Sequence, residues 1–242
     1  MNIVVDTHAH TLVSGHAYST IHEMARAGAG HGLKVLALTE HAPQMPGTCG
    51  EFYFENLKVV PREMEGIRLL LGAEVNIMNE KGEVDLDNRI LKNLDIVLAS
   101  IHRPTWGVGK TKKEITNAYV NVMNNPYVSI IAHPDDERFP VDYDVLVKHA
   151  KRTGTLLEVN NSSLRTDTMR QNAKENIVRM LKLCKEHRVP ITTGSDAHVD
   201  VDAGGFDLVK QVLKECDFPE KLVVTTSFEK LKTFLPKLRQ GL

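Results

Sequence analysis

Short apolar runs that alternate with helical patterns limit the fold of this chain more than any other feature. The run 34–39, Lys-Val-Leu-Ala-Leu-Thr, does not alternate between polar and apolar residues, which is typical of a parallel strand covered on both faces. The predicted strands are 3–5, 34–39, 68–73, 95–100, 128–132, 156–159 and 190–195. Helical segments separate most of these strands, so the sequence favours an α/β barrel.

The segments between the strands carry helix signals. Thr20 with Glu23, and Thr111 with Glu114, form the capping-box pattern that begins a helix. Helices are expected after these residues and at 87–94, 143–152, 174–186, 206–214 and from about residue 227, with loops at 42–55 and 103–110. A chain of 242 residues, 42% of them hydrophobic, can bury one large core. We therefore expect one domain over residues 1–242.

Charge and composition argue against several classes of protein. The formal net charge is −1, and the 30 basic residues are dispersed along the chain, so a basic face for nucleic acid is not expected. No segment resembles a signal peptide or approaches the roughly 20 apolar residues of a membrane helix, and we expect a soluble, cytoplasmic protein. Three cysteines without a C-x-x-C pair indicate neither a disulfide framework nor a thiolate metal site.

Residues of the types that bind metals stand at the ends of six of the seven predicted strands. Only 11 of the 242 residues are histidine, one in 22, so their concentration at strand ends is not readily assigned to chance. The carboxyl ends of barrel strands meet at one face, where active sites are built. The candidate metal ligands, including one histidine in the first loop, are His8, His10, His16, His41, Glu74, His102, His133, Asp196 and His198.

Seven imidazoles and two carboxylates form a ligand set that suits Zn, Mn or Fe better than Mg or Ca. Nine ligands are too many for one four-coordinate ion. If Glu74 bridges two ions, ten bonds are available, which is enough for three ions with three or four bonds each. Such ions keep positions open for water and substrate, as catalytic sites do.

Hydrolysis of a phosphate ester is the chemistry that needs several such ions. One ion lowers the pKa of its bound water to give hydroxide for the attack, and the others hold the phosphoryl oxygens. Arg103, beside His102, is the best candidate for a phosphate clamp, although a salt bridge on a loop explains it equally well. Arg138 and Arg165 are weaker candidates. The catalytic role is thus predicted for Glu74, Asp196 and Arg103.

Six short motifs resemble the PHP (polymerase and histidinol phosphatase) superfamily, and most closely its YcdX-type stand-alone phosphatases. The motifs are DTHAHT at 6–11, TEH at 39–41, GAE at 72–74, SIH at 100–102, AHP at 132–134 and GSDAH at 194–198, together with HAYST at 16–20. This resemblance implies a distorted TIM-like (β/α)7 barrel with a trinuclear centre, usually of zinc, in a single metal-dependent hydrolase domain.

The resemblance also divides the candidate ligands among three ions. His8, His10, Glu74 and Asp196 would hold the first ion. Glu74, His102 and His133 would hold the second. The third would be held by His16, His41 and His198. Asp6 matches the family motif without being a ligand, and we expect it to orient a ligating histidine through a hydrogen bond.

The sequence favours a metal-dependent phosphatase that acts on a small phosphomonoester. Histidinol phosphate is one candidate substrate, although nothing in the sequence spells out an imidazole pocket. A phosphodiesterase or exonuclease of the PHP type is the alternative enzyme, and a non-catalytic metal-binding PHP module is the alternative outside catalysis. The expected partner is a small phosphorylated substrate, with neither nucleic acid nor membrane, and the sequence leaves a homo-oligomer open.

Overall fold

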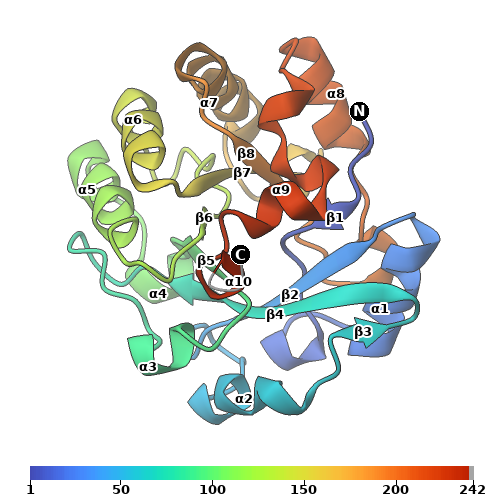
Figure 1. Ribbon diagram of the computed structural model, residues 1–242. Coiled ribbons are helices and arrows are strands. Elements are labelled where there is room, and N and C mark those ends of the chain that lie inside the picture. Colours follow the sequence, from blue (N-terminus) through green and yellow to red (C-terminus); the bar gives the residue numbers. More distant parts are fainter. Residues whose placement is uncertain (240–242) are drawn as a thin grey trace.

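Seven parallel strands form the centre of the computed structural model, which describes residues 1–239 (Figure 1). Neighbours pair in the order β1-β2-β4-β5-β6-β7-β8, and each of these pairs is parallel. The strands are β1 (Val5–Asp6), β2 (Val35–His41), β4 (Ile67–Asn76), β5 (Ile96–Ser100), β6 (Ile130–Ile131), β7 (Leu156–Asn160) and β8 (Ile191–Gly194). A short strand, β3 (Glu63–Met64), pairs antiparallel with β4.

The first and last strands approach each other and nearly close the ring. The amide of Thr7 donates to the carbonyl of Thr193 at 3.4 Å, and Ala9 and Ala197 form an isolated parallel bridge just beyond the strand ends. The predicted α/β barrel of seven parallel strands is therefore confirmed. Its closing seam is held by these few bonds rather than by a full strand ladder.

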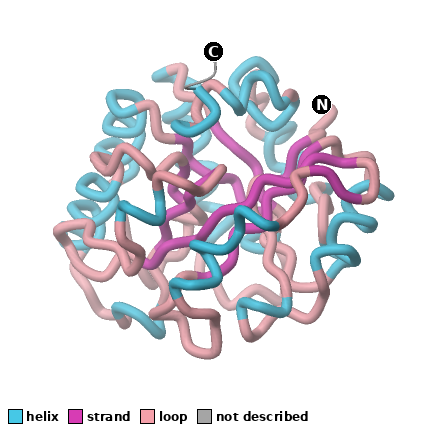
Figure 2. The backbone as a smooth tube through the Cα atoms, turned by 60° about the horizontal axis from the view of Figure 1, so that its bottom comes forward, coloured by secondary structure: helices cyan, strands magenta, loops and turns pink. Residues whose placement is uncertain are grey.

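Helices surround the strands, as the tube drawing shows (Figure 2). Both predicted capping boxes are present, with the Thr20 and Thr111 hydroxyls accepting from the Glu23 and Glu114 amides. The longer helices are α1 (Ile21–Gly30), α5 (Lys112–Val122), α6 (Tyr143–Thr153), α7 (Ala173–His187) and α8 (Asp207–Glu215). None of the helices in the described part of the chain is long and apolar enough to cross a membrane.

Several short helices lie in or near the connecting segments. The predicted loops 42–55 and 103–110 contain helical turns, in α2 (Glu51–Asn56) and α4 (Arg103–Trp106), because Gly50 and His102 take extended conformations from which a helix can begin. The helix expected at 87–94 is shorter, α3 (Asn88–Leu91). These turns lengthen the rim of the barrel without changing its order of strands.

The C-terminal segment closes the amino end of the barrel. Its elements are α9 (Phe228–Lys232) and α10 (Pro236–Arg239), which lie across the middle of the ring of strands in Figure 1. Leu231 and Leu235 are fully buried and share a cluster with the inward-facing strand residues Val5, Val35 and Leu70. This apolar cluster fills the amino end of the barrel interior, and the polar groups lie at the carboxyl end.

Candidate metal centre

The strand ends bring eight of the nine predicted ligands together at the carboxyl end of the barrel. His8 and His10 follow β1, and His102 and His133 follow β5 and β6. His41 and Glu74 occupy paired positions at the ends of β2 and β4. Asp196 and His198 lie just beyond β8, while His16 comes from the loop after the short 3-10 helix Leu12–Ser14.

Glu74 lies at the centre of this cluster and is fully buried. Its Oε1 atom is 2.7 Å from His133 Nε2 and 3.4 Å from His102 Nε2. Its Oε2 atom is 2.9 Å from His41 Nδ1, 3.3 Å from His8 Nε2 and 3.5 Å from His10 Nε2. A single carboxylate therefore faces five imidazole rings, the arrangement expected of a ligand shared between ions.

His8, His10 and Asp196 form a second group beside Glu74. The two Nε2 atoms are only 3.0 Å apart, and Asp196 Oδ1 lies 3.5 Å from that of His8 and 3.4 Å from that of His10. Two neutral imidazoles that face each other with ring nitrogens need a proton or a cation between them. A proton or a cation is therefore expected between the Nε2 atoms of His8 and His10.

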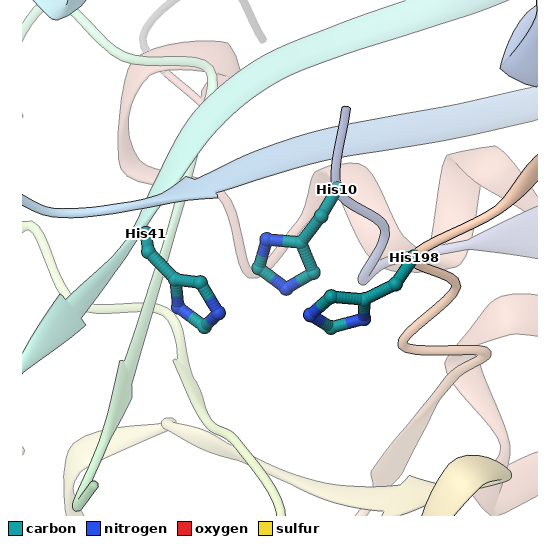
Figure 3. Close-up of side chains that lie close together, drawn as sticks. All are labelled: His10, His41 and His198. Atoms are coloured by element: carbon teal, nitrogen blue, oxygen red, sulfur yellow. The ribbon is translucent and has the colours of Figure 1, made fainter. Parts of the chain in front are cut away.

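His10, His41 and His198 form a further group, and Figure 3 shows their rings pointing toward one another from three separate segments. The His16 ring centroid lies 4.8 Å from that of His41 and 4.9 Å from that of His198. His41 also groups with Glu74 and His102. The ligand atoms are thus close enough to be shared, and the division among three ions stays a prediction.

Several observations fit a metal-binding centre. His41 Nδ1 and Glu74 Oε2 are 2.9 Å apart but are not oriented for a hydrogen bond. These two atoms and His41 Nε2 are buried without a hydrogen-bond partner among residues 1–239. Burial alone would raise the pKa of Glu74, but the neighbouring His102, His8 and His41 hold it well below its usual range. Imidazole nitrogens and carboxylate oxygens that lack hydrogen-bond partners and converge on one point are the ligand atoms that Zn, Mn or Fe bind.

The electrostatics of His8 point the same way. Burial lowers the pKa of His8, yet the carboxylates of Glu158, Asp196 and Glu74 outweigh it and raise the pKa well above its ordinary value. A buried site that holds a proton this tightly stabilises positive charge. A bound metal ion would supply that charge when the ring is neutral.

Glu158 is a functional candidate that the sequence analysis missed. It lies in β7, the one strand without a predicted ligand, and its Oε1 atom is 2.9 Å from His8 Nδ1. Its Oε2 atom accepts from the His133 amide at 2.8 Å and from Asn160 Nδ2 at 3.1 Å. The available signal was one charged residue inside an apolar strand that is buried on both faces.

Other buried polar groups hold His10 and His102. His10 Nδ1 is 3.1 Å from the Ser14 hydroxyl, which donates to Glu40 Oε2 at 2.6 Å. His102 Nδ1 is 2.8 Å from Asn76 Oδ1. In each ring the Nδ1 side meets an acceptor, so Nε2 faces the cluster with its lone pair.

Asp6 does not orient a histidine ring, which corrects the sequence expectation. Its carboxylate accepts from the backbone amides of His8 at 3.2 Å, Ser195 at 3.0 Å and Gly204 at 3.0 Å. Burial raises the pKa of Asp6 to about 6. Asp6 therefore fixes the backbone at the seam between β1 and β8, because its partners are backbone amides that follow β1 and β8 and no histidine ring nitrogen is among them in the described structure.

Two of the predicted ligands have unusual backbone conformations. His133 has φ 30° and Asp196 has φ 56°, in the left-handed region that disfavours residues with a Cβ. Hydrogen bonds hold both in place, because the His133 amide donates to Glu158 and the Asp196 amide donates to the carbonyl of His8 at 2.8 Å. The chain thus accepts local strain at the points where these side chains turn toward the cluster.

A cavity of about 690 Å³ opens beside the cluster and is lined by His16, His41, His102, His133, Asp196 and His198. Four arginines also line it. Arg138 binds Asp136, with Nη2 and Oδ2 2.6 Å apart, and Arg165 pairs with two carboxylates. Arg103 is exposed and has no carboxylate partner among the described residues. It is therefore the arginine best able to receive an anion.

Arg170, the fourth arginine, was not predicted. Its Nη2 atom donates to Asp196 Oδ2 at 2.8 Å, and its Nη1 atom donates to Ser163 Oγ at 2.9 Å. Burial lowers the pKa of Arg170, but the carboxylates of Asp196 and Asp135 outweigh this effect and raise the pKa above its usual value, so the guanidinium stays charged. Arg170 lies in the irregular segment before α7, where no periodicity indicates which side chains point inward, and its own side chain is partly buried.

Known proteins resemble this chain over nearly its whole length. The sequence profile described as PHP domain matches residues 6–192. A probable phosphatase of Clostridium novyi is 45% identical over 235 residues, covering 97% of this chain and 95% of the relative. A probable phosphatase of Caldanaerobacter subterraneus subsp. tengcongensis is 42% identical over 240 residues, covering 99% of this chain and 94% of the relative.

A solved structure shares the fold at lower sequence identity. Histidinol phosphate phosphatase from Lactococcus lactis, determined with zinc, L-histidinol and phosphate, superposes with a TM-score of 0.55 and 17% identity. The match covers 89% of this chain and 94% of that one. At this identity the likeness supports the barrel and its order of strands.

Proposed function

This chain belongs to the PHP domain family and is a phosphoric ester hydrolase, and on that premise we propose that it uses bound metal ions to hydrolyse a small phosphomonoester. The observation that carries the proposal is the position of Glu74, a fully buried carboxylate within 3.5 Å of ring nitrogens from five histidines. Such a group is costly to bury unless cations join it.

We assign the ligands as the family resemblance divides them. His8, His10, Glu74 and Asp196 would hold one ion, Glu74, His102 and His133 a second, and His16, His41 and His198 a third. The short distances from the His16 ring to the His41 and His198 rings support the third set, and the approach of Glu74 to both His8 and His133 supports its sharing between the first two ions. Zinc is the proposed metal, with Mn or Fe as alternatives, because the donors are imidazole nitrogens and carboxylate oxygens.

When bound, the ions would supply a nucleophile from water at neutral pH and neutralise charge on the phosphoryl oxygens. The chain's own residues orient the reaction. Ser14 and Asn76 fix the rings of His10 and His102, so that Nε2 of each faces the cluster. Arg103, at the rim of the cavity, would bind the phosphoryl oxygens as a bidentate donor.

The shape and charge of the cavity favour a small phosphomonoester over nucleic acid. Its volume of about 690 Å³ suits a metabolite-sized leaving group. Arg138 and Arg165, on its wall, are already neutralised by Asp136, Asp167 and Asp202. A cavity with most of its cations paired does not form the continuous basic track that a nucleic acid strand needs.

The test is release of inorganic phosphate from an aryl phosphate by protein purified with its native metals. We expect a chelator to abolish release and added zinc or manganese to restore it. Glu74→Gln is the matched inactive control. Activity that a chelator leaves unchanged would contradict the proposal.

A panel of substrates separates the alternatives. We expect phosphorylated metabolites to be hydrolysed faster than a bis-aryl phosphodiester or single-stranded DNA. Faster cleavage of the diester or the DNA would assign the phosphodiesterase or exonuclease function. Metal binding without hydrolysis of any of them would indicate a non-catalytic module.

A further inference from the structure

Glu158 contacts two predicted ligands assigned to different ions, although it is itself outside the ligand set. We propose that Glu158 is a positioning residue that holds His8 and His133 in their ligating geometry and so couples two metal positions. The inference rests on the proposed metal centre and not on the phosphatase activity. It rests on the two oxygens of one fully buried carboxylate, because Oε1 contacts His8 and Oε2 contacts His133.

The first oxygen, Oε1, sets the tautomer of His8. Glu158 Oε1 lies 2.9 Å from His8 Nδ1, and both side chains are completely buried. An ionised carboxylate only accepts, so Nδ1 must carry the hydrogen. The lone pair of His8 is then on Nε2, the atom that lies 3.3 Å from Glu74 Oε2 and 3.5 Å from Asp196 Oδ1.

The second oxygen, Oε2, holds the backbone of His133. Glu158 Oε2 accepts the His133 amide at 2.8 Å, at a residue whose φ of 30° is strained. This conformation brings His133 Nε2 to 2.7 Å from Glu74 Oε1. Without the Glu158 acceptor, the His133 amide would be buried and unpaired, and the strained backbone of His133 would be expected to change its conformation.

Close neighbours on two sides restrict the position of the Glu158 carboxylate. A Cβ atom built at Gly194 would lie 2.0 Å from Glu158 Oε1 and 2.5 Å from His8 Cβ, so β8 approaches this pair as closely as a glycine permits. On the other side, Asn160 Nδ2 donates to Glu158 Oε2 at 3.1 Å and to Asp196 Oδ2 at 3.3 Å. The carboxylate is thus fixed between β1, β7 and β8.

An amide of the same shape cannot replace this carboxylate. Glu158 faces three donors, and two of them, the His133 amide and Asn160 Nδ2, meet the same oxygen. In Glu158→Gln, the amide oxygen would take that place and turn its NH₂ group toward His8 Nδ1. His8 would then carry its hydrogen on Nε2 and lose the lone pair that faces the metal.

The experiment compares Glu158→Gln with Asp95→Asn by chelator competition and elemental analysis. Asp95 is a matched control at the opposite end of the barrel, a buried carboxylate that accepts from Arg62 Nε at 2.6 Å, the Leu71 amide at 3.0 Å and Lys237 Nζ at 2.7 Å. We expect Glu158→Gln to weaken zinc binding about 10- to 100-fold. Asp95→Asn should keep the metal affinity of the parent while lowering its melting temperature.

Thermal unfolding with and without zinc separates positioning from general stability. A ligand stabilises the folded state according to its affinity, so Glu158→Gln should shrink the rise in melting temperature that zinc produces. Asp95→Asn should lower both melting temperatures equally. Parent-like zinc affinity in Glu158→Gln would overturn the proposal, even if phosphate release is intact.

A measurement on the parent protein keeps the proposal testable if Glu158→Gln does not fold. Nitrogen-15 NMR of the histidine rings in the zinc-loaded protein reports which nitrogen carries hydrogen. We expect His8 to be protonated on Nδ1 only. Hydrogen on Nε2 of His8 would overturn the proposal. Zinc binding without release of phosphate would instead contradict only the proposed phosphatase function.

Discussion

The two ends of the barrel have opposite chemistry. At the carboxyl end, Glu74 and His8 are fully buried beside other ionisable groups whose polar atoms converge on one another. At the amino end, Leu231 and Leu235 fill the interior with apolar contacts. The apolar packing at the amino end stabilises the barrel. The carboxyl end holds polar groups that are costly to bury, and this is the end where barrels of this kind build active sites.

Two buried aspartates repeat this contrast on a small scale. Asp95, at the amino end, accepts from Arg62, Leu71 and Lys237. Asp135, just beyond β6 at the carboxyl end, is fully buried and neither of its carboxylate oxygens has a hydrogen-bond partner in the described structure. Asp95 therefore has its carboxylate satisfied by three donors, whereas Asp135 is buried without such partners.

The largest effect is expected from Glu74→Gln. The amide keeps the shape but loses the charge shared by five histidines, so metal content should fall and kcat/KM should drop by on the order of 10³-fold or more. Elemental analysis and a phosphate-release assay measure the two quantities. If both stay at the level of the parent, the carboxyl end is not organised around Glu74.

At the amino end, Leu235→Ala should cost about 2–5 kcal/mol of unfolding free energy because it leaves a cavity in the apolar cluster. Urea unfolding of the metal-loaded protein measures this loss. We expect metal content and kcat to remain those of the parent. A parallel loss of metal would show that the two ends are coupled, contrary to their separation in the structure.

Asp135→Asn should stabilise the protein above pH 7. Burial raises the pKa of Asp135 from 3.8 to about 7, so the folded state binds this proton more tightly than the unfolded state does. Stability is then lost as pH rises from about 4 to about 7, by at most about 4 kcal/mol, and the amide removes that loss. Unfolding at pH 8 and pH 5 measures the difference, and equal effects at both would contradict this assignment.

Arg103→Ala should have the smallest effect at the carboxyl end. We expect about a tenfold rise in KM or fall in kcat, since one exposed charged hydrogen-bond donor to phosphate is lost. Metal content should not change, because the Arg103 side chain makes no hydrogen bond or ion pair with a predicted ligand in the described structure. An equal loss of metal would instead indicate a structural role for Arg103.

The strand ends could be predicted because each ligand follows an apolar run, and parallel strands bring their carboxyl ends to one face. His41 and Glu74 illustrate this, since adjacent β-strands place them in register. Glu158 could not be found in this way because it lies within a strand rather than at its end. Arg170 comes from an irregular segment, and its contact with Asp196 depends on tertiary packing.

Asp6 shows a different limit of sequence reasoning. A motif position next to two histidines predicted a bond to a ring, whereas the carboxylate accepts backbone amides from residues near it and from residues almost 200 positions away. The pattern identified a buried polar residue. Its partners were set by the closing of the barrel, which brings the first and last strands together.

Stepwise return of zinc to the metal-free protein, with phosphate release from an aryl phosphate followed at each step, tests the central claim most directly. We expect no release without metal, and activity that rises to a plateau as zinc approaches three equivalents per chain. A plateau at one equivalent would contradict the trinuclear centre. Phosphate release by the metal-free protein would contradict the metal-dependent mechanism itself.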